Sequence, residues 1–222
     1  PISKSAVEML EALSPDLVVC FDCLGNDLIE GMINDAPFDL SEQTPMDLLL
    51  SDVERLVTRL SSLSAEVFLA TLPKPNVLPF FQLKRTRLIA DGTQPDADVL
   101  LSSLGESAER VNEHLLIEAA KHQNVHVVDL AALADQWVSR GVIVGDETLR
   151  VAPFGGLVGL DGLHFTDVGY ALLANTFIEK MNDVLGDEIP MIDVVTVREG
   201  DREHPDILHS ADRNLSECQP TL

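Results

Sequence analysis

The sequence is poor in cysteine, in aromatic residues and in positively charged residues. Its 3 cysteines are an odd number, and in a chain of this length they do not make the disulfide framework of a small secreted domain. With 15 basic against 37 acidic residues, the formal net charge is −22. This charge argues against nucleic acid or an anionic membrane surface as partner, because either would repel the chain. No apolar run approaches the roughly 18 residues of a membrane span, so we expect no transmembrane segment.

The sequence does contain enough apolar residues for a folded core. Hydrophobic residues make up 45% of the 222 residues, which excludes wholesale disorder, because disorder requires low hydrophobicity together with charge. The length predicts one domain, or one domain with a tail. The chain begins Pro1-Ile2-Ser3, with neither a methionine nor an apolar signal region. We therefore expect a processed chain or a piece of a longer protein.

Strands and helices are expected to alternate along the chain. The strands are predicted at 17–23, 66–72 and 125–130, and the helices at 5–13, 44–63, 98–122, 131–140 and 168–185. The segment 78–90 is ambiguous, and 142–159 is expected to be irregular. This alternation predicts a parallel sheet in a layered α/β domain. Three strands make a thin sheet for so many helices.

The character of the sequence changes after Gly186, where it turns polar and loses its periodicity. The stretch 199–205 is mostly charged and has no apolar face. We therefore expect residues 1–199 to form the folded domain and residues 200–222 to form an acidic, flexible tail.

Cys20 and Cys23 have the spacing of a redox or metal-ligand pair, but they lie in the first predicted strand. Residues three apart in a strand point to opposite faces. The prediction is therefore that the two cysteines neither bridge nor share a metal, and that they serve as small buried apolar residues. Cys218 falls in the predicted tail.

The strongest signal for chemistry is an acid and a histidine three residues apart. Asp161 and His164 precede the last long helix, for which Thr166 is the expected N-cap. At this spacing the carboxylate can accept from one ring nitrogen, which leaves the other free to take a proton from a nucleophile. A solvated surface pair is the alternative. Asp201 and His204 repeat the spacing in the charged stretch, and we interpret that copy as a solvated pair.

A second signal follows the first predicted strand, at Gly25 and Asn26. Ligands of parallel α/β sheets bind beyond the carboxyl ends of the strands. A neutral amide there can donate to an oxyanion without bringing a charge. An ordinary turn is the alternative, since glycine and asparagine both favour turns.

Together these segments resemble conserved blocks of the SGNH (GDSL-type) hydrolase family. The segment 15–28, which ends in GNDL, resembles the third block of the family. The segment 161–170, DGLHFTDVGY, resembles its last block, Asp-Gly-x-His-x-Thr-x-x-Gly-Tyr. The segments 71–73 and 79–81 are similar to the region after the family's fourth strand. The resemblance extends from about residue 5 to residue 197.

The resemblance implies a three-layer α/β/α, flavodoxin-like fold with a parallel sheet, of which the first two strands are missing here. It implies that His164 is the general base, Asp161 its orienting acid and Asn26 an oxyanion donor. Phe80 and Phe81 are candidates for the lining of an acyl pocket, with plain core packing as the alternative. The family resemblance also favours a secreted or periplasmic location.

The sequence departs from the family pattern in two places. Leu24 stands where the third block of the family has its first glycine. The Gly-Asp-Ser block that carries the nucleophile is absent, and no Gly-x-Ser-x-Gly elbow replaces it, so no catalytic serine is assigned. We expect an upstream segment of the same protein to supply the serine and to complete the sheet. Without that segment, 17–23 would be an exposed apolar edge, which natural folds avoid.

The leading hypothesis is a serine ester hydrolase, an esterase or lipase that acts through an acyl-enzyme on a small-molecule or lipid ester. A non-catalytic SGNH-like binding domain that has lost its nucleophile and a carbohydrate O-deacetylase are the alternatives. We expect no cofactor and no metal, because no acidic or cysteine side chain completes a ligand set with the neighbouring histidines, His114, His122 and His126. The sequence leaves the acyl chain length and the oligomeric state open.

Overall fold

The described part of the chain divides into two compact units. The computed structural model describes residues 5–34, 36–186 and 188–200. Within these residues, the first unit comprises those up to 76 together with 84–133, and the second comprises 77–83 and those from 134 onward. Two helices, α4 (Pro79–Ala90) and α6 (Leu130–Arg140), contribute residues to both units. The segment 78–90, ambiguous in the sequence, is thus helical from Pro79.

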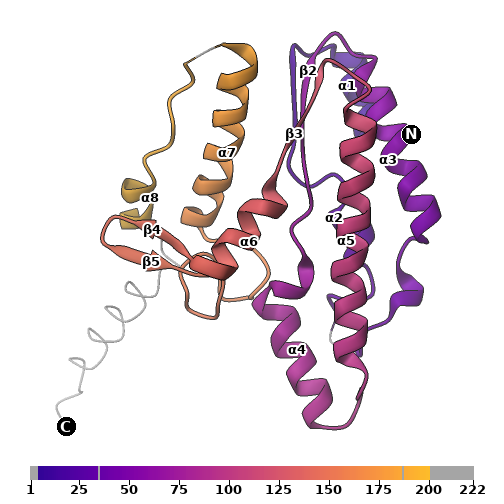
Figure 1. Ribbon diagram of the computed structural model, residues 1–222, viewed down its shortest axis with the longest axis vertical. Helices are drawn as coiled ribbons and strands as arrows, with labels where there is room; N and C mark the ends of the chain where they lie inside the picture. The colour runs from indigo at the N-terminus through magenta and orange to yellow at the C-terminus, as the bar shows by residue number, and fades with distance from the viewer. Residues whose placement is uncertain (1–4, 35, 187, 201–222) are drawn as a thin grey trace, which may run out of the picture. The chain divides into compact units, whose positions relative to one another are not determined.

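The first unit contains a parallel sheet of three strands. They are β1 (Leu17–Cys20), β2 (Glu66–Ala70) and β3 (Val125–Val128), paired in the order β1-β2-β3 (Figure 1). This confirms the predicted α/β class with a parallel sheet. Each strand ends two or three residues before its predicted end. Beyond β2, for example, the backbone N–H and C=O of Leu72 bond to the side-chain amide of Asn112, at 2.7 and 2.8 Å, and not to a neighbouring strand.

The first unit contains the helices predicted at 5–13, 44–63 and 98–122, with small shifts at their ends, and one further short helix at Gly25–Ile29, which was not predicted. Besides parts of α4 and α6, they are α1 (Ala6–Leu13), α2 (Gly25–Ile29), α3 (Met46–Ser61) and α5 (Ala97–Ala119), with short 3-10 helices at Leu40–Glu42 and Pro75–Val77. Helix α3 starts two residues later than predicted. Pro45 has extended backbone angles and occupies the N-cap position, so the helix begins at Met46 without a side-chain cap.

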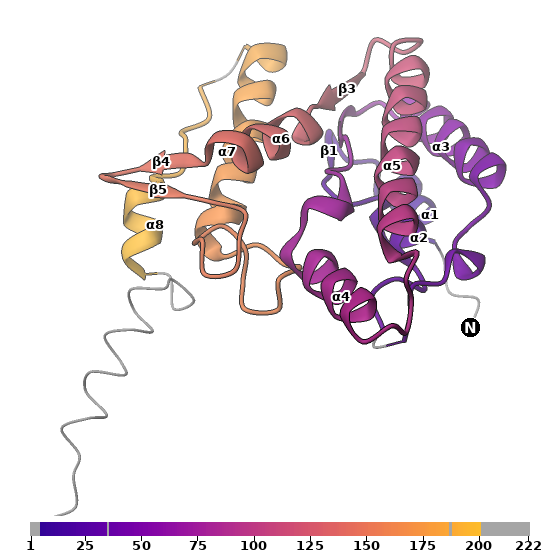
Figure 2. The same ribbon diagram turned by 60° about the horizontal axis from the view of Figure 1, so that its bottom comes forward.

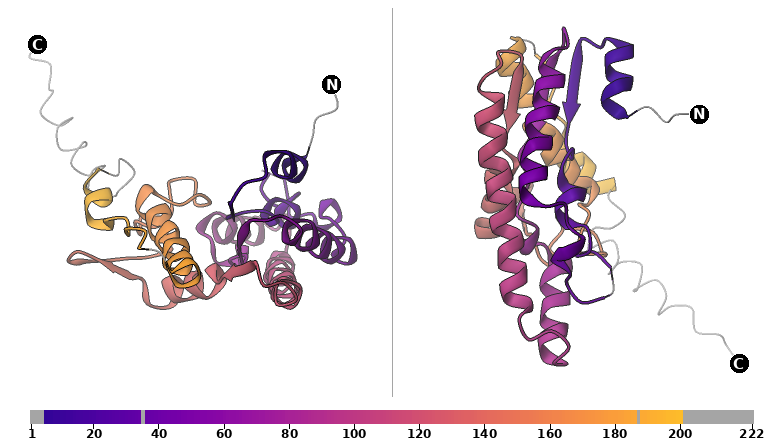
Figure 3. Two further views of the ribbon diagram at one scale, coloured as in Figure 1. Left: turned by 90° about the horizontal axis from the view of Figure 1, so that it is seen from above. Right: turned by 90° about the vertical axis from the view of Figure 1, so that its right-hand side faces the viewer.

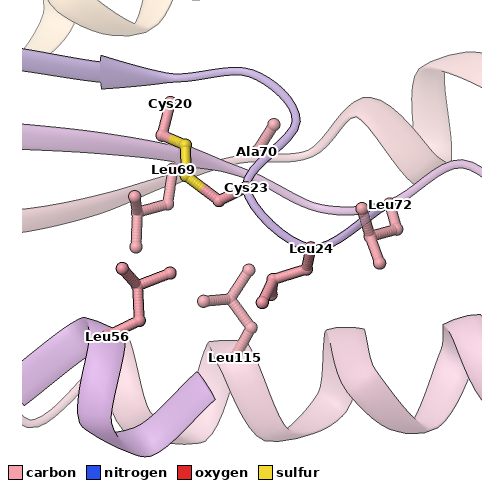
Figure 4. Close-up of a pocket in the computed structure, with 8 residues that line it drawn as sticks. All are labelled: Cys20, Cys23, Leu24, Leu56, Leu69, Ala70, Leu72 and Leu115. Atoms are coloured by element: carbon pink, nitrogen blue, oxygen red, sulfur yellow. A yellow bond between two sulfur atoms is a disulfide. The ribbon is translucent and has the colours of Figure 1, made fainter. Parts of the chain in front are cut away.

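Helices α3 and α5 supply much of the core of the first unit, and they run side by side (Figure 3). Apolar residues of α3 recur at helical spacing, and four of them are buried: Leu49, Val53, Val57 and Leu60. Leu48 of the same helix is 54% exposed. Figure 4 shows Leu56 of α3 and Leu115 of α5 pointing toward the end of β1 and toward Leu69 of β2. One face of the sheet is therefore packed on this helix pair.

Strand β1 is the edge of the sheet, and two of its apolar side chains face solvent. Leu17 is 41% exposed and Val19 is 48% exposed, whereas Val18 between them is buried. Among the described residues, no strand pairs with the outer side of β1. The edge therefore presents both apolar side chains and unpaired backbone groups, a combination that natural sheets usually protect.

The second unit contains a β-hairpin that the sequence analysis missed. Strands β4 (Val142–Val144) and β5 (Glu147–Leu149) pair in antiparallel fashion within the segment predicted to be irregular (Figure 2). The two residues between them are Gly145, with φ of +62°, and Asp146. A two-residue Gly-Asp connection is typical of a hairpin, and here it follows the apolar run at 142–144, but the second strand, at 147–149, is not apolar.

The second unit also contains α7 (Asp167–Leu185) and α8 (Val194–Gly200). The stretch after Gly186 has little helical periodicity, but two asparagines of α7 hold it. Asn182 bonds both the N–H and the C=O of Ile189, at 2.8 and 2.9 Å. Asn175 does the same for Ile192, at 2.7 and 2.9 Å. The predicted tail, apart from Gly200, lies outside the described residues, as do Cys218 and the Asp201–His204 pair.

No helix among residues 5–34, 36–186 and 188–200 combines the length and the apolar character needed to cross a membrane.

Candidate functional site

The structure brings Asp161 and His164 together in the second unit. The Nδ1 atom of His164 lies 2.6 Å from Oδ2 of Asp161. The other carboxylate oxygen, Oδ1, accepts from the backbone N–H groups of Leu163 and His164, at 2.9 and 3.0 Å. An ionised carboxylate only accepts hydrogen bonds, so Nδ1 carries the proton. The lone pair on Nε2 is then available to a proton donor.

Asp161 is held in its ionised form by this geometry. Partial burial opposes the charge, but hydrogen bonds from the His164 ring and from the backbone N–H groups of Leu163 and His164 outweigh it. The pKa of Asp161 is therefore below its usual value. At neutral pH the carboxylate fixes the ring tautomer and can stabilise an imidazolium when one forms.

The dyad is open to solvent. The side chain of His164 is 68% exposed and that of Asp161 is 51% exposed. A solvated surface pair would have the same exposure, so exposure does not separate the two interpretations. The double backbone contact of Asp161 is more specific, because it fixes the carboxylate before any substrate arrives.

Thr166 anchors the end of the dyad loop. Its hydroxyl accepts from the N–H of Gly169 at 3.2 Å, which confirms the predicted N-cap of α7. The same hydroxyl donates to the carbonyl of Gly156 at 2.9 Å, and the residue is buried. One side chain therefore joins the helix start to the loop that precedes the dyad.

Gly162 in the dyad loop and Gly169 in the first turn of α7 sit where a side chain would collide with backbone. Gly162 has φ of +72°, and a Cβ there would lie 2.8 Å from the backbone nitrogen of Phe80. A Cβ on Gly169 would lie 2.5 Å from the carbonyl oxygen of Leu157. These contacts give a physical reason for the glycines of the DGLHFTDVGY segment.

Three aromatic side chains, Trp137, Phe165 and Tyr170, form a row that packs beside the dyad loop. The rings of Trp137 and Phe165 meet edge to face with centroids 5.8 Å apart, and Phe165 meets Tyr170 in the same way at 5.8 Å. Trp137 is buried, while Tyr170 is partly exposed. The residue next to His164 is therefore fixed by packing on both sides.

Phe80 and Phe81, proposed from the resemblance for an acyl pocket, differ in their surroundings. Phe81 is fully buried, and Phe80 is half-buried. The backbone N–H of Phe80 donates to the carbonyl of Gly162 at 2.9 Å. This contact places Phe80 against the dyad loop, a link that sequence reasoning did not find. Gly162 was the signal for it, since a glycine with positive φ permits such a close approach.

Asn26 belongs to the first unit, and the dyad belongs to the second. The segment GNDL, expected as a turn or an oxyanion element, forms the start of the five-residue helix α2. Asn26 is exposed on it. The N–H of Gly25 bonds to Oδ1 of Asp22 at 3.0 Å, which links the helix to the turn after β1.

The prediction that Cys20 and Cys23 cannot bridge is wrong. The structure joins them in a disulfide with Cα atoms 5.9 Å apart, a usual separation for such bonds. The prediction assumed that the strand continues to Cys23, whereas β1 ends at Cys20 and the chain then bends. Cys23 is also exposed, not buried. The disulfide lines a small apolar pocket with Leu24, Leu56, Leu69, Ala70, Leu72 and Leu115 (Figure 4).

Comparison with known proteins does not assign the chain to a family. No protein-family model, no curated protein and no solved structure matches it. No group of three or more histidine, cysteine or acidic side chains within the described residues is arranged to hold a metal ion. A functional assignment therefore depends on the motif at 161–170 and on the geometry of the dyad.

Proposed function

We propose that this chain carries the general base of a serine ester hydrolase of SGNH type, which acts through an acyl-enzyme on a small-molecule or lipid ester. The observation that carries the proposal is the contact between His164 Nδ1 and Asp161 Oδ2 at 2.6 Å, with two backbone N–H groups on the other carboxylate oxygen. This leaves Nε2 as the proton acceptor, which is the arrangement that activates a hydroxyl nucleophile.

In the proposed reaction His164 takes the proton of a serine hydroxyl as the serine oxygen attacks the ester carbonyl. Asp161 stabilises the imidazolium that forms, and His164 then returns the proton to the leaving alcohol. Water, deprotonated by His164 in turn, releases the acyl group. The amide of Asn26 is proposed to donate to the oxyanion of the tetrahedral intermediates.

The nucleophilic serine is proposed to come from a segment upstream of this chain. Ser139 is the one serine among the described residues of the second unit, and its hydroxyl donates to the carbonyl of Gln136 at 3.1 Å. The exposed edge strand β1, with Leu17 and Val19 facing solvent, also supports an upstream segment. A further strand on that edge would cover apolar surface and pair free backbone groups.

A non-catalytic binding domain is the second candidate. It is favoured by the bonding of Ser139, the one serine in the described residues of the second unit. Its hydroxyl donates to the carbonyl of Gln136 and not to His164. A domain that has lost its nucleophile would retain the loop, the N-cap and the aromatic row for purely structural reasons.

The test is hydrolysis of short p-nitrophenyl esters by the full-length gene product, with His164→Ala as the variant. Removal of a general base is expected to lower kcat/KM by about 10²–10⁴-fold. His122→Ala is the matched control, because His122 lies outside the dyad loop and its replacement should leave the rate unchanged. Labelling by a fluorophosphonate reports the serine independently of turnover.

Equal activity of the His164→Ala protein and the wild type would refute the mechanism. No hydrolysis and no phosphonate labelling of the full-length protein would favour the binding domain. Among active proteins, a preference for acetylated sugars over p-nitrophenyl esters would indicate an O-deacetylase, which uses the same chemistry on another substrate.

A further inference from the structure

The turn between β1 and α2 is closed by the Cys20–Cys23 disulfide at the edge of the sheet. Cys20 is the last residue of β1 and is half-buried, whereas Cys23 is exposed, as are Phe21 and Asp22 between them. Leu24 follows and is buried. Cys23 is therefore the more exposed of the two residues, and both cysteines line the small apolar pocket shown in Figure 4.

Two properties distinguish this disulfide from one that staples a fold. It spans a sequence separation of 3, and disulfides that close short loops restrict the unfolded chain least. One of its two residues, Cys23, is exposed, and exposed disulfides are the labile ones. The residues it encloses are exposed, so the bond can open without breaking core packing.

We propose that Cys20 and Cys23 form a redox-active disulfide that exchanges with low-molecular-weight thiols, and that its reduction loosens the turn between β1 and α2. The same turn also contains the hydrogen bond from the N–H of Gly25 to the carboxylate of Asp22. Opening the disulfide removes the covalent cross-link between Cys20, at the end of β1, and Cys23, two residues before α2.

The exchange proceeds in two balanced steps. A thiolate attacks Sγ of Cys23, the more exposed residue, which breaks the protein disulfide and releases Cys20 as a thiolate that takes up a proton. A second thiolate attacks the sulfur of the small thiol in the mixed disulfide, which releases Cys23 as a thiolate that is also protonated. Two small thiols become one small disulfide, and their two electrons reduce the protein disulfide to two thiols.

The experiment equilibrates the 222-residue chain with mixtures of reduced and oxidised glutathione. All proteins carry Cys218→Ser, so that only the pair is measured. Acid quenching, alkylation with N-ethylmaleimide and mass spectrometry count the free thiols. We expect a reversible transition from zero to two thiols as the proportion of reduced glutathione rises. A pair that stays fully oxidised in excess reduced glutathione, or fully reduced in oxidised glutathione, would overturn the proposal.

Hydrogen exchange of the same samples tests the structural consequence. Peptides within 17–30 should exchange faster in the reduced protein, while a peptide over β3 should be unchanged and serves as the internal control. Equal exchange of both peptides in the two redox states would show that reduction does not loosen the turn. Because one protein with Cys20 and Cys23 intact is compared in its oxidised and reduced states, the result does not depend on whether a variant of either cysteine folds.

Single variants test which sulfur is attacked. Cys20→Ser leaves Cys23 alone and should form a mixed disulfide with oxidised glutathione about tenfold faster than Cys23→Ser, because reactivity follows exposure. Equal rates, or a faster reaction at Cys20, would contradict the proposed order of attack. None of these measurements involves ester hydrolysis, so the redox site is tested independently of the proposed function.

Discussion

The two segments that point to a hydrolase are held in place to very different degrees. The dyad loop is fixed from several sides, by the two backbone bonds to Asp161, by the double contact of the Thr166 hydroxyl and by the contact of Gly162 with Phe80. The segment with Asn26 is a five-residue helix without a side-chain cap. It follows that local contacts fix the geometry of the proposed base, whereas fewer bonds fix the segment that carries the proposed oxyanion donor, Asn26.

Gly162→Ala should give the largest effect on this comparison. A Cβ at this position meets the backbone of Phe80 at 2.8 Å, and φ is +72°. Strain and close contact together are expected to lower the free energy of unfolding by about 2–4 kcal/mol. Trp137, the single tryptophan, is buried beside Phe165 in the same unit. Its fluorescence during urea unfolding therefore reports the second unit directly.

Gly186→Ala is the matched control for that substitution. Gly186 has φ of +69°, but nothing lies within 4 Å of its added Cβ. It should cost about 1 kcal/mol, from backbone strain alone. If both alanine variants lose the same stability, the approach of Phe80 contributes nothing, and the dyad loop is less constrained than its geometry indicates.

Thr166→Val should cause the next largest loss of unfolding free energy. It removes the cap of α7 and leaves the Gly156 carbonyl without its donor. The expected loss is about 1–2 kcal/mol of unfolding free energy, measured by the same fluorescence. Thr176→Val is the control, since the Thr176 hydroxyl only bonds back to the carbonyl of Leu172 within α7. Equal losses in the two variants would assign the effect to the exchange of threonine for valine in general and not to the cap.

The sequence predictions succeeded where local spacing decides the structure, and they failed where the ends of elements or distant contacts decide it. Long apolar periodicity predicted the α/β class, α3 and α7, and the acid, histidine and N-cap of 161–170 are joined by local bonds that spacing alone implies. What failed depended on where elements end. The strand prediction ran on to Cys23, and this excluded a disulfide that a bend after Cys20 permits. The contact of Phe80 with Gly162 joins residues distant in sequence, which no local pattern encodes.

Asp161→Asn should have a smaller effect on stability, with a definite dependence on pH. The folded-state pKa of Asp161 is lowered, so its contribution is present above the pKa of the unfolded chain and is lost as pH falls through the folded value. Because the side chain is 51% exposed, solvent screening keeps the difference below about 1 kcal/mol. Wild type and variant should therefore differ near neutral pH and converge in acid.

Nitrogen NMR of His164 gives the more direct measurement. In the wild type the proton should reside on Nδ1, and in the Asp161→Asn variant this preference should weaken, because the amide is neutral and can present either end to the ring. A tautomer that is the same in both proteins would mean that Asp161 does not orient the histidine. That result would remove the main support for His164 as a base.

Gly25→Ala should have the smallest effect, and it tests the other half of the comparison. An added Cβ would meet Oδ1 of Asp22, but that atom is the end of an exposed side chain, which can rotate away. Alanine is also the better helix former, so the net change in unfolding free energy should stay within about 0.5 kcal/mol. Circular dichroism during thermal unfolding measures it, and Trp137 fluorescence should be unaffected. A loss as large as that of Gly162→Ala would show that the segment with Asn26 is as firmly built as the dyad loop. The proposed oxyanion donor would then be as tightly constrained as the proposed base.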